Sequence, residues 1–145
     1  MVTNVGYVVS TDPTRLDLDR VHAFLTDESY WSRGIPRELV ERAVAGSLVF
    51  GVYHGDEQVG FARVVTDRAT FAWLCDVFVV GAHRGRAAGK QLIEAVVAHP
   101  DLRGLRRFLL ATADAHGLYR QFGFRDLERP ERFLAIERPA AELFA

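Results

Sequence analysis

The sequence predicts a single domain of the α/β (α+β) class that covers residues 1–145. Three observations lead to this prediction. The length of 145 residues is sufficient for one core of ordinary size and too short for two. A hydrophobic content of 49% and a charged content of 26% are typical of globular proteins. Segments with the spacing of strands alternate along the chain with segments that have the spacing of helices.

The bulk composition excludes several classes of protein. A formal net charge of −1 gives no global field that would attract nucleic acid or an acidic membrane surface, and no apolar stretch approaches the length of a membrane span. Cys75 is the only cysteine, so an internal disulfide is impossible and a reducing, cytoplasmic location is expected. The His, Cys and Asp residues do not have the spacing of a metal site, so we predict no metal.

The first third of the chain predicts one strand and two helices. The strand covers residues 7–10, and the first helix runs from about Leu18 to Leu25 behind Asp17 or Asp19 as its N-cap. Pro36 suits the first turn of the second helix, which Gly46 ends. The loop between the two helices, residues 27–34, is rich in aromatic and hydroxyl side chains.

The remainder of the chain predicts mainly strands, with two further helices. Gly55-Asp56 is a turn pair, which predicts a hairpin of residues 47–54 and 58–66. A helix is expected from Arg86 to the stop at Pro100-Asp101, and a second helix carries Tyr119. The other expected strands are residues 72–80, 105–111, 124–127 and 133–136.

The segment from Val77 to Lys90 passes from a strand through a short basic loop into a helix. This arrangement presents backbone N–H groups to a phosphate, and glycines permit close approach of the ligand. Lys90, the only lysine of the chain, adds positive charge at that point. Gln91 stands where a nucleoside-triphosphate loop needs Ser or Thr, and the glycine spacing is not that of a dinucleotide fingerprint. The phosphate ligand therefore belongs to another class.

Two motifs resemble the GNAT superfamily of acyl-CoA-dependent N-acetyltransferases. Residues 84–89, Arg-Gly-Arg-Ala-Ala-Gly, resemble its signature [QR]-x-x-G-x-[GA], and residues 115–124 resemble its later motif A-x-x-L-Y-x-x-x-G-F. The order of the elements is also similar to that family. The resemblance implies a single-domain GNAT fold: a mixed, mostly antiparallel sheet with splayed central strands and helices on both faces.

The resemblance implies acetyl-CoA as the co-substrate. Its pyrophosphate would lie on the N–H groups of residues 85–90, and its pantetheine arm would pair with the backbone of Phe78 and Val80. The residues implied at the cofactor are Phe78, Val79, Val80, Arg84, Gly85, Arg86, Ala87, Ala88, Gly89, Lys90 and His116. Ala87 departs from the family's central glycine. Alanine still offers its N–H, and it is unfavourable only if the position needs a positive φ or very close contact.

The motif position of Tyr119 implies a general acid that protonates the leaving thiolate, because a phenol with a pKa near ~10 is neutral at pH 7. A second interpretation is a packed tyrosine on an amphipathic helix. Asp76, a lone carboxylate in an apolar strand, is the candidate base, whose pKa burial would raise. Two alternatives stay open: Asp76 is a purely structural residue, or water accepts the proton of the amine. His116 is a cofactor contact, a surface histidine or a catalytic residue.

Tyr30 and Trp31 belong to the loop that usually covers the acceptor in the family, so they either line the acceptor site or cover the core. The resemblance implies a primary amine of a small molecule or amino-acid-like compound as acceptor. The alternatives are acetylation of a protein lysine or N-terminus, or a non-catalytic CoA-binding sensor or interaction module. A homodimer is compatible with each of these. Fold analogy does not identify the acceptor.

Overall fold

The computed structural model describes residues 6–144, so residues 1–5 and 145 of the predicted domain lie outside the described part. Its centre is a five-stranded sheet with the order β1-β2-β3-β4-β5. Neighbouring strands are antiparallel except for β4 and β5, which are parallel. The strands are β1 (Tyr7–Ser10), β2 (Leu48–His54), β3 (Glu57–Thr66), β4 (Phe71–Val79) and β5 (Arg107–Leu110).

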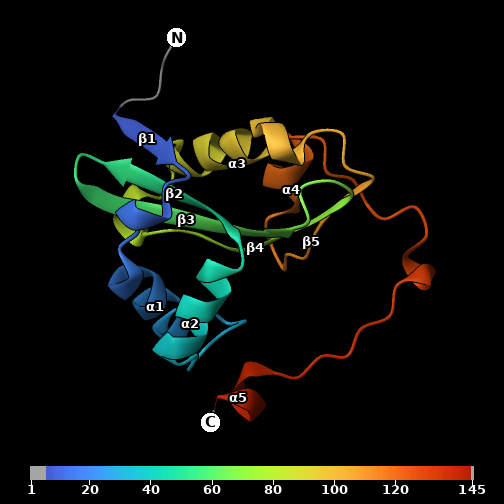
Figure 1. Cartoon of the computed structure of the whole chain (residues 1–145), viewed down its shortest axis with the longest axis horizontal. Helices are drawn as coiled ribbons and strands as arrows, with labels where there is room; N and C mark the ends of the chain where they lie inside the picture. The colour runs from blue at the N-terminus through green and yellow to red at the C-terminus, as the bar shows by residue number, and fades with distance from the viewer. Residues whose placement is uncertain (1–5, 145) are drawn as a thin grey trace.

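Helices cover both faces of the sheet (Figure 1). Helices α1 (Leu18–Asp27) and α2 (Arg37–Ala45) lie on one face, and α3 (Ala88–Ala98) and α4 (His116–Arg120) lie on the other. A separate group of buried apolar side chains fills each of the two layers. The α/β class, the mixed sheet and the helices on both faces are therefore confirmed.

Local sequence explains where the first two helices begin and end. The Asp17 side chain accepts a hydrogen bond from the backbone N–H of Arg20, so Asp17 is the N-cap of α1. Pro36 precedes α2, and the N–H of Gly46 closes its last turn. No helix within residues 6–144 has the length and apolar character needed to cross a bilayer.

The two parallel strands separate along their length. Residues 71–74 of β4 pair with residues 107–110 of β5, whereas within residues 6–144 the second half of β4 has no partner on that side. The β3–β4 register shifts between Phe61 and Arg63, which places a β-bulge opposite Ala62. The bulge and the short β5 together produce the splay between β4 and β5 that the family resemblance implied.

The two predicted C-terminal strands, residues 124–127 and 133–136, are wrong. In the described chain these residues have no regular secondary structure and belong to no sheet. Residues 125–139 are exposed and form an arch away from the body, which ends at the short helix α5 (Ala140–Leu143) (Figure 1). The segment has the apolar composition of a strand, but in the described chain no strand lies beside it. Its apolar side chains are therefore exposed, Leu134 by 98% and Ile136 by 89%.

Candidate active site

The loop between β4 and α3 has unoccupied backbone donors. In the described chain, no side chain caps the N-terminus of helix α3, and the backbone N–H of Gln91 donates to the carbonyl of Ala87 at 3.0 Å. Within the described chain, no backbone acceptor binds the N–H groups of residues 85–90. Together with the positive end of the α3 dipole, these donors form a site for an anion such as a pyrophosphate.

Left-handed backbone at two positions shapes this loop. Gly85 has a φ of +76° and Ala87 a φ of +73°. Helix α3 therefore begins at Ala88 rather than at the predicted Arg86, because a left-handed residue cannot continue a right-handed helix. Ala87 is thus at the kind of position at which the family's glycine is favourable, and its side chain costs conformational energy there.

The cations of the loop have different roles. The guanidinium of Arg84 donates from Nε to the carbonyl oxygen of Val79 at 2.9 Å, which ties the loop to the end of β4. Arg86 and Lys90 are exposed beside the free N–H groups. A Cβ added at Gly89 would meet Val79 Cγ2 at 3.9 Å, an ordinary van der Waals contact, so this position has room for a side chain. Ala88 is buried and anchors the first turn in the core.

The end of β4 has a backbone edge that β5 does not cover, on which Arg84 binds the Val79 carbonyl. The N–H of Val80 donates to the carbonyl of Val59 at 2.8 Å, so it faces β3 and is not available to a ligand. Backbone groups of successive residues point to opposite edges, so those of Val79 face the side that β5 does not reach. The Phe78 ring belongs to the core, where it stacks on Phe24 with the centroids 4.0 Å apart.

A cleft of about 520 Å³ lies at the splay between β4 and β5. It brings together four predicted site residues, Tyr30, Trp31, Asp76 and Tyr119. Tyr30 and Trp31 enter it from the α1–α2 loop and contact each other edge to face, with ring centroids 5.0 Å apart. The buried Ser29 holds this loop by accepting the Ser32 N–H and donating to the carbonyl of Leu25.

Asp76 lies at the bulge of β4 with a φ of +55°, an unusual value for a residue other than glycine. One carboxylate oxygen accepts the Nε1–H of Trp31 at 2.8 Å, and the other accepts Nε–H of Arg63 at 2.8 Å. Arg63 donates in turn to Ser47 Oγ at 3.1 Å. A carboxylate has about four lone-pair sites, so Asp76 keeps acceptor capacity toward the cleft.

Tyr119 extends from α4 into the cleft and is only 8% exposed. Burial, with smaller contributions from Asp114 and Tyr30, raises the pKa of the phenol to about 12. The hydroxyl is therefore protonated at neutral pH and can donate a proton. His116 is exposed at the start of α4 and shares with Tyr119 a neighbouring groove beside β5. Burial also raises the pKa of the Cys75 thiol to about 12, so this residue is no nucleophile.

Sequence reasoning missed three residues of the cleft, Arg63, Trp73 and Asp114. A signal existed for Arg63, which is a charged residue inside the apolar run of β3, just as Asp76 is inside that of β4. Trp73 lies two residues before Cys75 on β4, so strand alternation places both on the same side. We see no sequence signal for Asp114. Within residues 6–144, no cluster of His, Cys, Asp or Glu side chains has the arrangement of a metal site.

Comparison with known proteins gives matches in sequence and in structure. Residues 45–126 match the family model described as an acetyltransferase (GNAT) domain. A curated protein of Gibberella zeae, classed by its name with the acetyltransferases, is 31% identical over 147 aligned residues. The match covers 86% of this chain and 82% of that protein.

Solved structures agree with this result. A Xanthomonas campestris pv. campestris protein, described as an acetyltransferase of the GNAT family, superposes with a TM-score of 0.91 at 49% identity, covering 92% of this chain and 94% of that one. An acetyltransferase from Clostridium acetobutylicum, solved with acetyl-CoA, superposes with a TM-score of 0.65 at 13% identity. That match covers 90% of this chain and 94% of the other, and it supports the fold.

Proposed function

This chain belongs to the GNAT family of acetyltransferases, and we propose that it transfers the acetyl group of acetyl-CoA directly to the primary amine of a small molecule. The proposed N-acetyltransferase domain comprises residues 1–145. The single observation that carries the cofactor assignment is the run of free backbone N–H groups at residues 85–90. They lie at the N-terminus of α3, where an anion is stabilised.

The remaining cofactor contacts follow the strand end. The exposed side chains of Arg86 and Lys90 would add charge beside the phosphates. The backbone N–H of Val79 would donate to a carbonyl of the pantetheine arm, because it faces the edge that β5 leaves open. Arg84 would act indirectly by fixing the loop to the Val79 carbonyl. When bound there, acetyl-CoA supplies the thioester whose carbonyl carbon an amine can attack.

Two residues of the cleft suit the two proton transfers. Tyr119 would donate its phenolic proton to the leaving thiolate, because its raised pKa keeps it protonated. The carboxylate of Asp76 would accept the proton of the attacking amine through the lone pairs that Trp31 and Arg63 do not occupy. The ring of Trp31, held by its bond to Asp76, and the ring of Tyr30 would form the wall against which the acceptor lies.

The dimensions of the cleft support a small acceptor. Its volume of about 520 Å³ lies within the range of small-molecule sites, roughly 300–1,000 Å³. The charged side chains of its lining are Arg63, which pairs with Asp76, and Asp114, so one net negative charge favours a cationic amine on approach. A protein substrate would also need a surface outside the cleft.

Paired variants at Gly89 test the cofactor site. Both Gly89→Glu and Gly89→Gln add a side chain of similar size beside the free N–H groups, and only Glu adds a negative charge. We expect Gly89→Glu to weaken acetyl-CoA binding at least tenfold relative to Gly89→Gln in a calorimetric titration. Equal acetyl-CoA affinities of the two variants would show that the pyrophosphate does not bind at this loop.

Turnover on a panel of amines tests the reaction itself. We expect release of free CoA to depend on an added small amine. Binding of acetyl-CoA without turnover on any amine would favour a sensor, whereas turnover only on peptides with a free lysine or N-terminus would indicate a protein acetyltransferase.

A further inference from the structure

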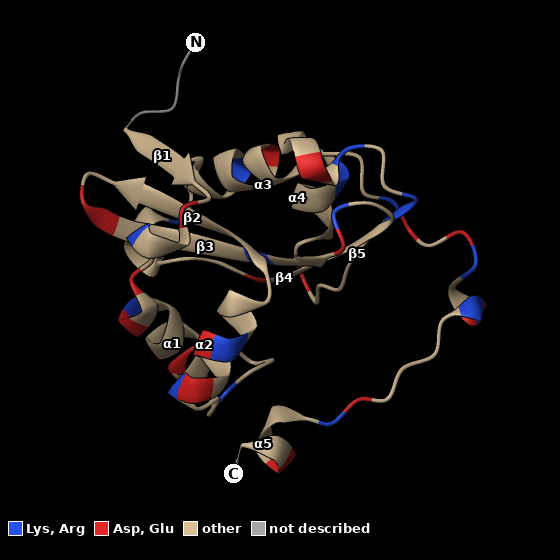
Figure 2. Ribbon diagram, viewed as in Figure 1, with Lys and Arg blue, Asp and Glu red and all other residues tan. Residues whose placement is uncertain are grey.

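The cleft of the proposed acceptor continues onto an uncharged part of the sheet. Both tryptophans of the chain, Trp31 and Trp73, line this cleft. Trp73 belongs to residues 71–75 of β4, which contain no charged side chain. Charged residues gather on α1, α2 and the C-terminal arch, whereas most of β3 and β4 is uncharged (Figure 2). The cleft is therefore apolar where it meets the first half of β4.

The apolar side chains of this part of the sheet lie outside the core. Trp73 is in register between Val65 of β3 and Leu109 of β5, and strand alternation places Phe71 on the same side as Trp73. Val65 is 41% and Phe71 39% exposed. In the described chain, Val65, Phe71 and Trp73 belong to neither of the two groups of buried apolar side chains. We call the surface that these three residues form the Trp73 face.

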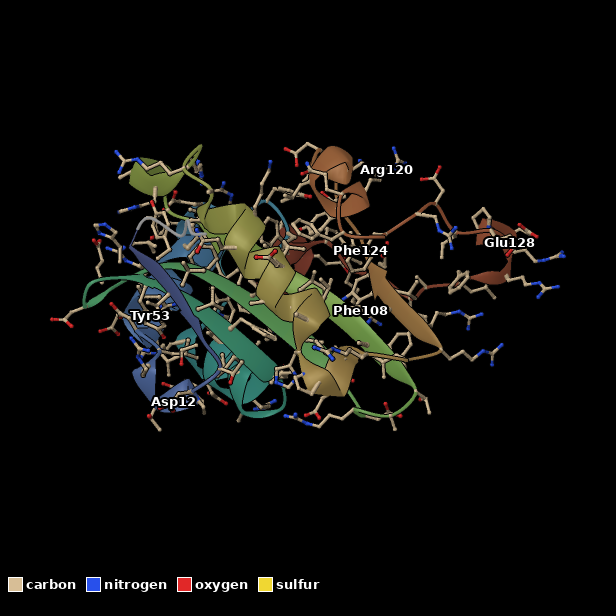
Figure 3. All side chains as sticks on the ribbon, turned by 90° about the horizontal axis from the view of Figure 1, so that it is seen from above. Asp12, Tyr53, Phe108, Arg120, Phe124 and Glu128 are labelled. Atoms are coloured by element: carbon tan, nitrogen blue, oxygen red, sulfur yellow. The ribbon has the colours of Figure 1, made fainter. Side chains whose placement is uncertain are left out.

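The opposite side of the same strands is packed. Phe108 of β5, the ladder partner of Ala72, contacts Phe124 edge to face with ring centroids 5.2 Å apart, and both rings pack on the core under α3 and α4 (Figure 3). Helices α1 and α2 pack on the part of the sheet that carries Phe61 and Phe78. An apolar sheet surface that the helices leave uncovered is typical of a binding site.

The direction of β4 relates the Trp73 face to the reacting groups. Asp76, the proposed base, lies three residues after Trp73 and five residues after Phe71. At about 3.3 Å per residue, these steps span roughly 10 and 16 Å. An amine held at Asp76 would therefore lay its body over Trp73 first and would reach Phe71 only if it is long.

Charge orients the ligand in the same sense. Within the cleft lining, Arg63 pairs with Asp76, so Asp114 leaves one net negative charge that attracts the ammonium end of an amine. The Trp73 face offers apolar surface to the other end of the ligand. That surface is favourable for a hydrocarbon or an aromatic ring and unfavourable for a second charge.

The backbone below the Trp73 face is already paired. Residues 72–75 of β4 pair with β3, and residues 71–74 pair with β5. Recognition of an extended peptide depends on free backbone groups, which this face does not offer. A peptide laid on it would lose hydrogen bonds to water without replacement. The surface therefore favours a small apolar ligand over a polypeptide.

Given the proposed acetyl transfer, on which this assignment rests, we propose that the acceptor is a primary amine with an apolar, ring-containing body, and that Trp73 is the residue that selects it. The amino group lies at Asp76 and Tyr119, and the ring lies on the indole of Trp73, with Val65 and Phe71 as its outer border. A ring is favourable there because contacts between aromatic rings add to the gain from apolar burial.

Equilibrium binding of three matched probes tests this proposal without turnover. Phenylbutylamine, with its ring at the chain end, differs from butylamine by the phenyl group, and phenylbutyrate carries a carboxylate in place of the ammonium group. Because both tryptophans line the cleft, their fluorescence reports its occupancy in titrations of the full chain with CoA present. We expect phenylbutylamine to bind roughly tenfold or more tightly than each of the other two probes. Equal affinity for phenylbutylamine and either other probe, or no binding of phenylbutylamine, overturns the proposal.

Two variants assign the effect to Trp73. Trp73→Ala removes the ring surface, so the affinity for phenylbutylamine should fall roughly tenfold, while that for butylamine changes less than about threefold. Trp73→Phe keeps an aromatic surface and should retain most of the affinity for phenylbutylamine. Trp31 remains as the fluorescent reporter in both variants, and circular dichroism verifies that they are folded. A folded Trp73→Ala variant that still prefers phenylbutylamine as the wild type does rejects the role of Trp73.

Turnover separates a failure of this proposal from a failure of the proposed function. Acetylation of both amines with equal kcat/KM, unchanged in Trp73→Ala, would leave acetyl transfer in place and overturn the selection by Trp73. Binding of phenylbutylamine that depends on Trp73, without release of CoA from acetyl-CoA, would support the subsite and reject acetyl transfer. A dimer that Trp73→Ala dissociates in light scattering would overturn the proposal, because a second copy would then cover the Trp73 face.

Discussion

Replacement of Ala87 by glycine should stabilise this protein. Ala87 has φ +73° and ψ −6°, in the left-handed region, and its methyl group is exposed. That conformation costs an L-residue roughly 1–2 kcal/mol. Glycine relieves the strain but adds about 0.4–1 kcal/mol of backbone entropy to the unfolded state. The net expectation for Ala87→Gly is therefore a gain of about 0.5–1 kcal/mol.

Thermal denaturation measures this gain. An unfolding entropy of about 2.1 cal/mol/K per residue gives roughly 0.3 kcal/mol/K for a chain of this length, so Tm should rise by about 2–3 °C. Gly85→Ala is the mirror-image control, because Gly85 has nearly the same φ, +76°, and a Cβ there meets nothing within 4 Å. It should lower Tm by a similar amount, and the double variant should be close to wild type.

The opposite sign would refute the reasoning. Replacing an alanine inside a helix by glycine lowers the free energy of unfolding by about 1 kcal/mol, and we expect this loss for Ala95→Gly within α3. If Ala87→Gly lowers Tm as Ala95→Gly does, residue 87 is helical in solution and the loop differs from the one described here. A rise in Tm with unchanged acetyl-CoA affinity would show that the strain lies in the fold and not in the binding site.

Three further predictions concern the cleft. Tyr119→Phe removes the proton donor and keeps the ring, so kcat should fall by a factor of about 10²–10⁴ with little change in the acetyl-CoA Kd. The phenol is needed in its protonated form, and its pKa is raised to about 12. Deprotonation of Tyr119 should therefore not lower the wild-type kcat near pH 10. Trp31→Phe removes the bond to Asp76, and Tyr30→Ala removes the ring beside it, so each should raise the amine KM more than the acetyl-CoA KM in steady-state assays; lower Tm with unchanged kinetics would leave them as packing residues. Asp76→Asn removes the proton acceptor and the ion pair with Arg63, so both Tm and kcat should fall; an unchanged kcat would make water the base.

The sequence predicted the elements whose signals are local. The hairpin around Gly55-Asp56 and the strand-loop-helix that ends in α3 each depend on a few adjacent residues, and the structure has both. The α3 boundary was missed because nothing in the letters Arg-Ala-Ala shows that Ala87 adopts a left-handed conformation. Alanine favours helix, and the loop geometry overrides that preference.

The rest depended on contacts between distant segments. The network of Trp31, Arg63 and Asp76 joins a loop and two strands, so the pairing of the carboxylate could not be read from the composition of β4 alone. Residues 133–136 have the composition of a strand, but a strand also needs a neighbour, and the part of the chain that the structure describes offers them none. Local propensity was the correct signal, and the missing information was tertiary.

The single thiol of Cys75 has a practical consequence for enzymology. With a pKa near 12, about one in 10⁴ of these side chains is a thiolate at pH 8, whereas an ordinary thiol with a pKa near 8.5 is about one-quarter ionised. Reagents that react with thiolates should therefore label free CoA much faster than the protein. A continuous assay with a chromogenic thiol reagent can then follow the release of CoA with little background from the protein, and Cys75 need not be replaced.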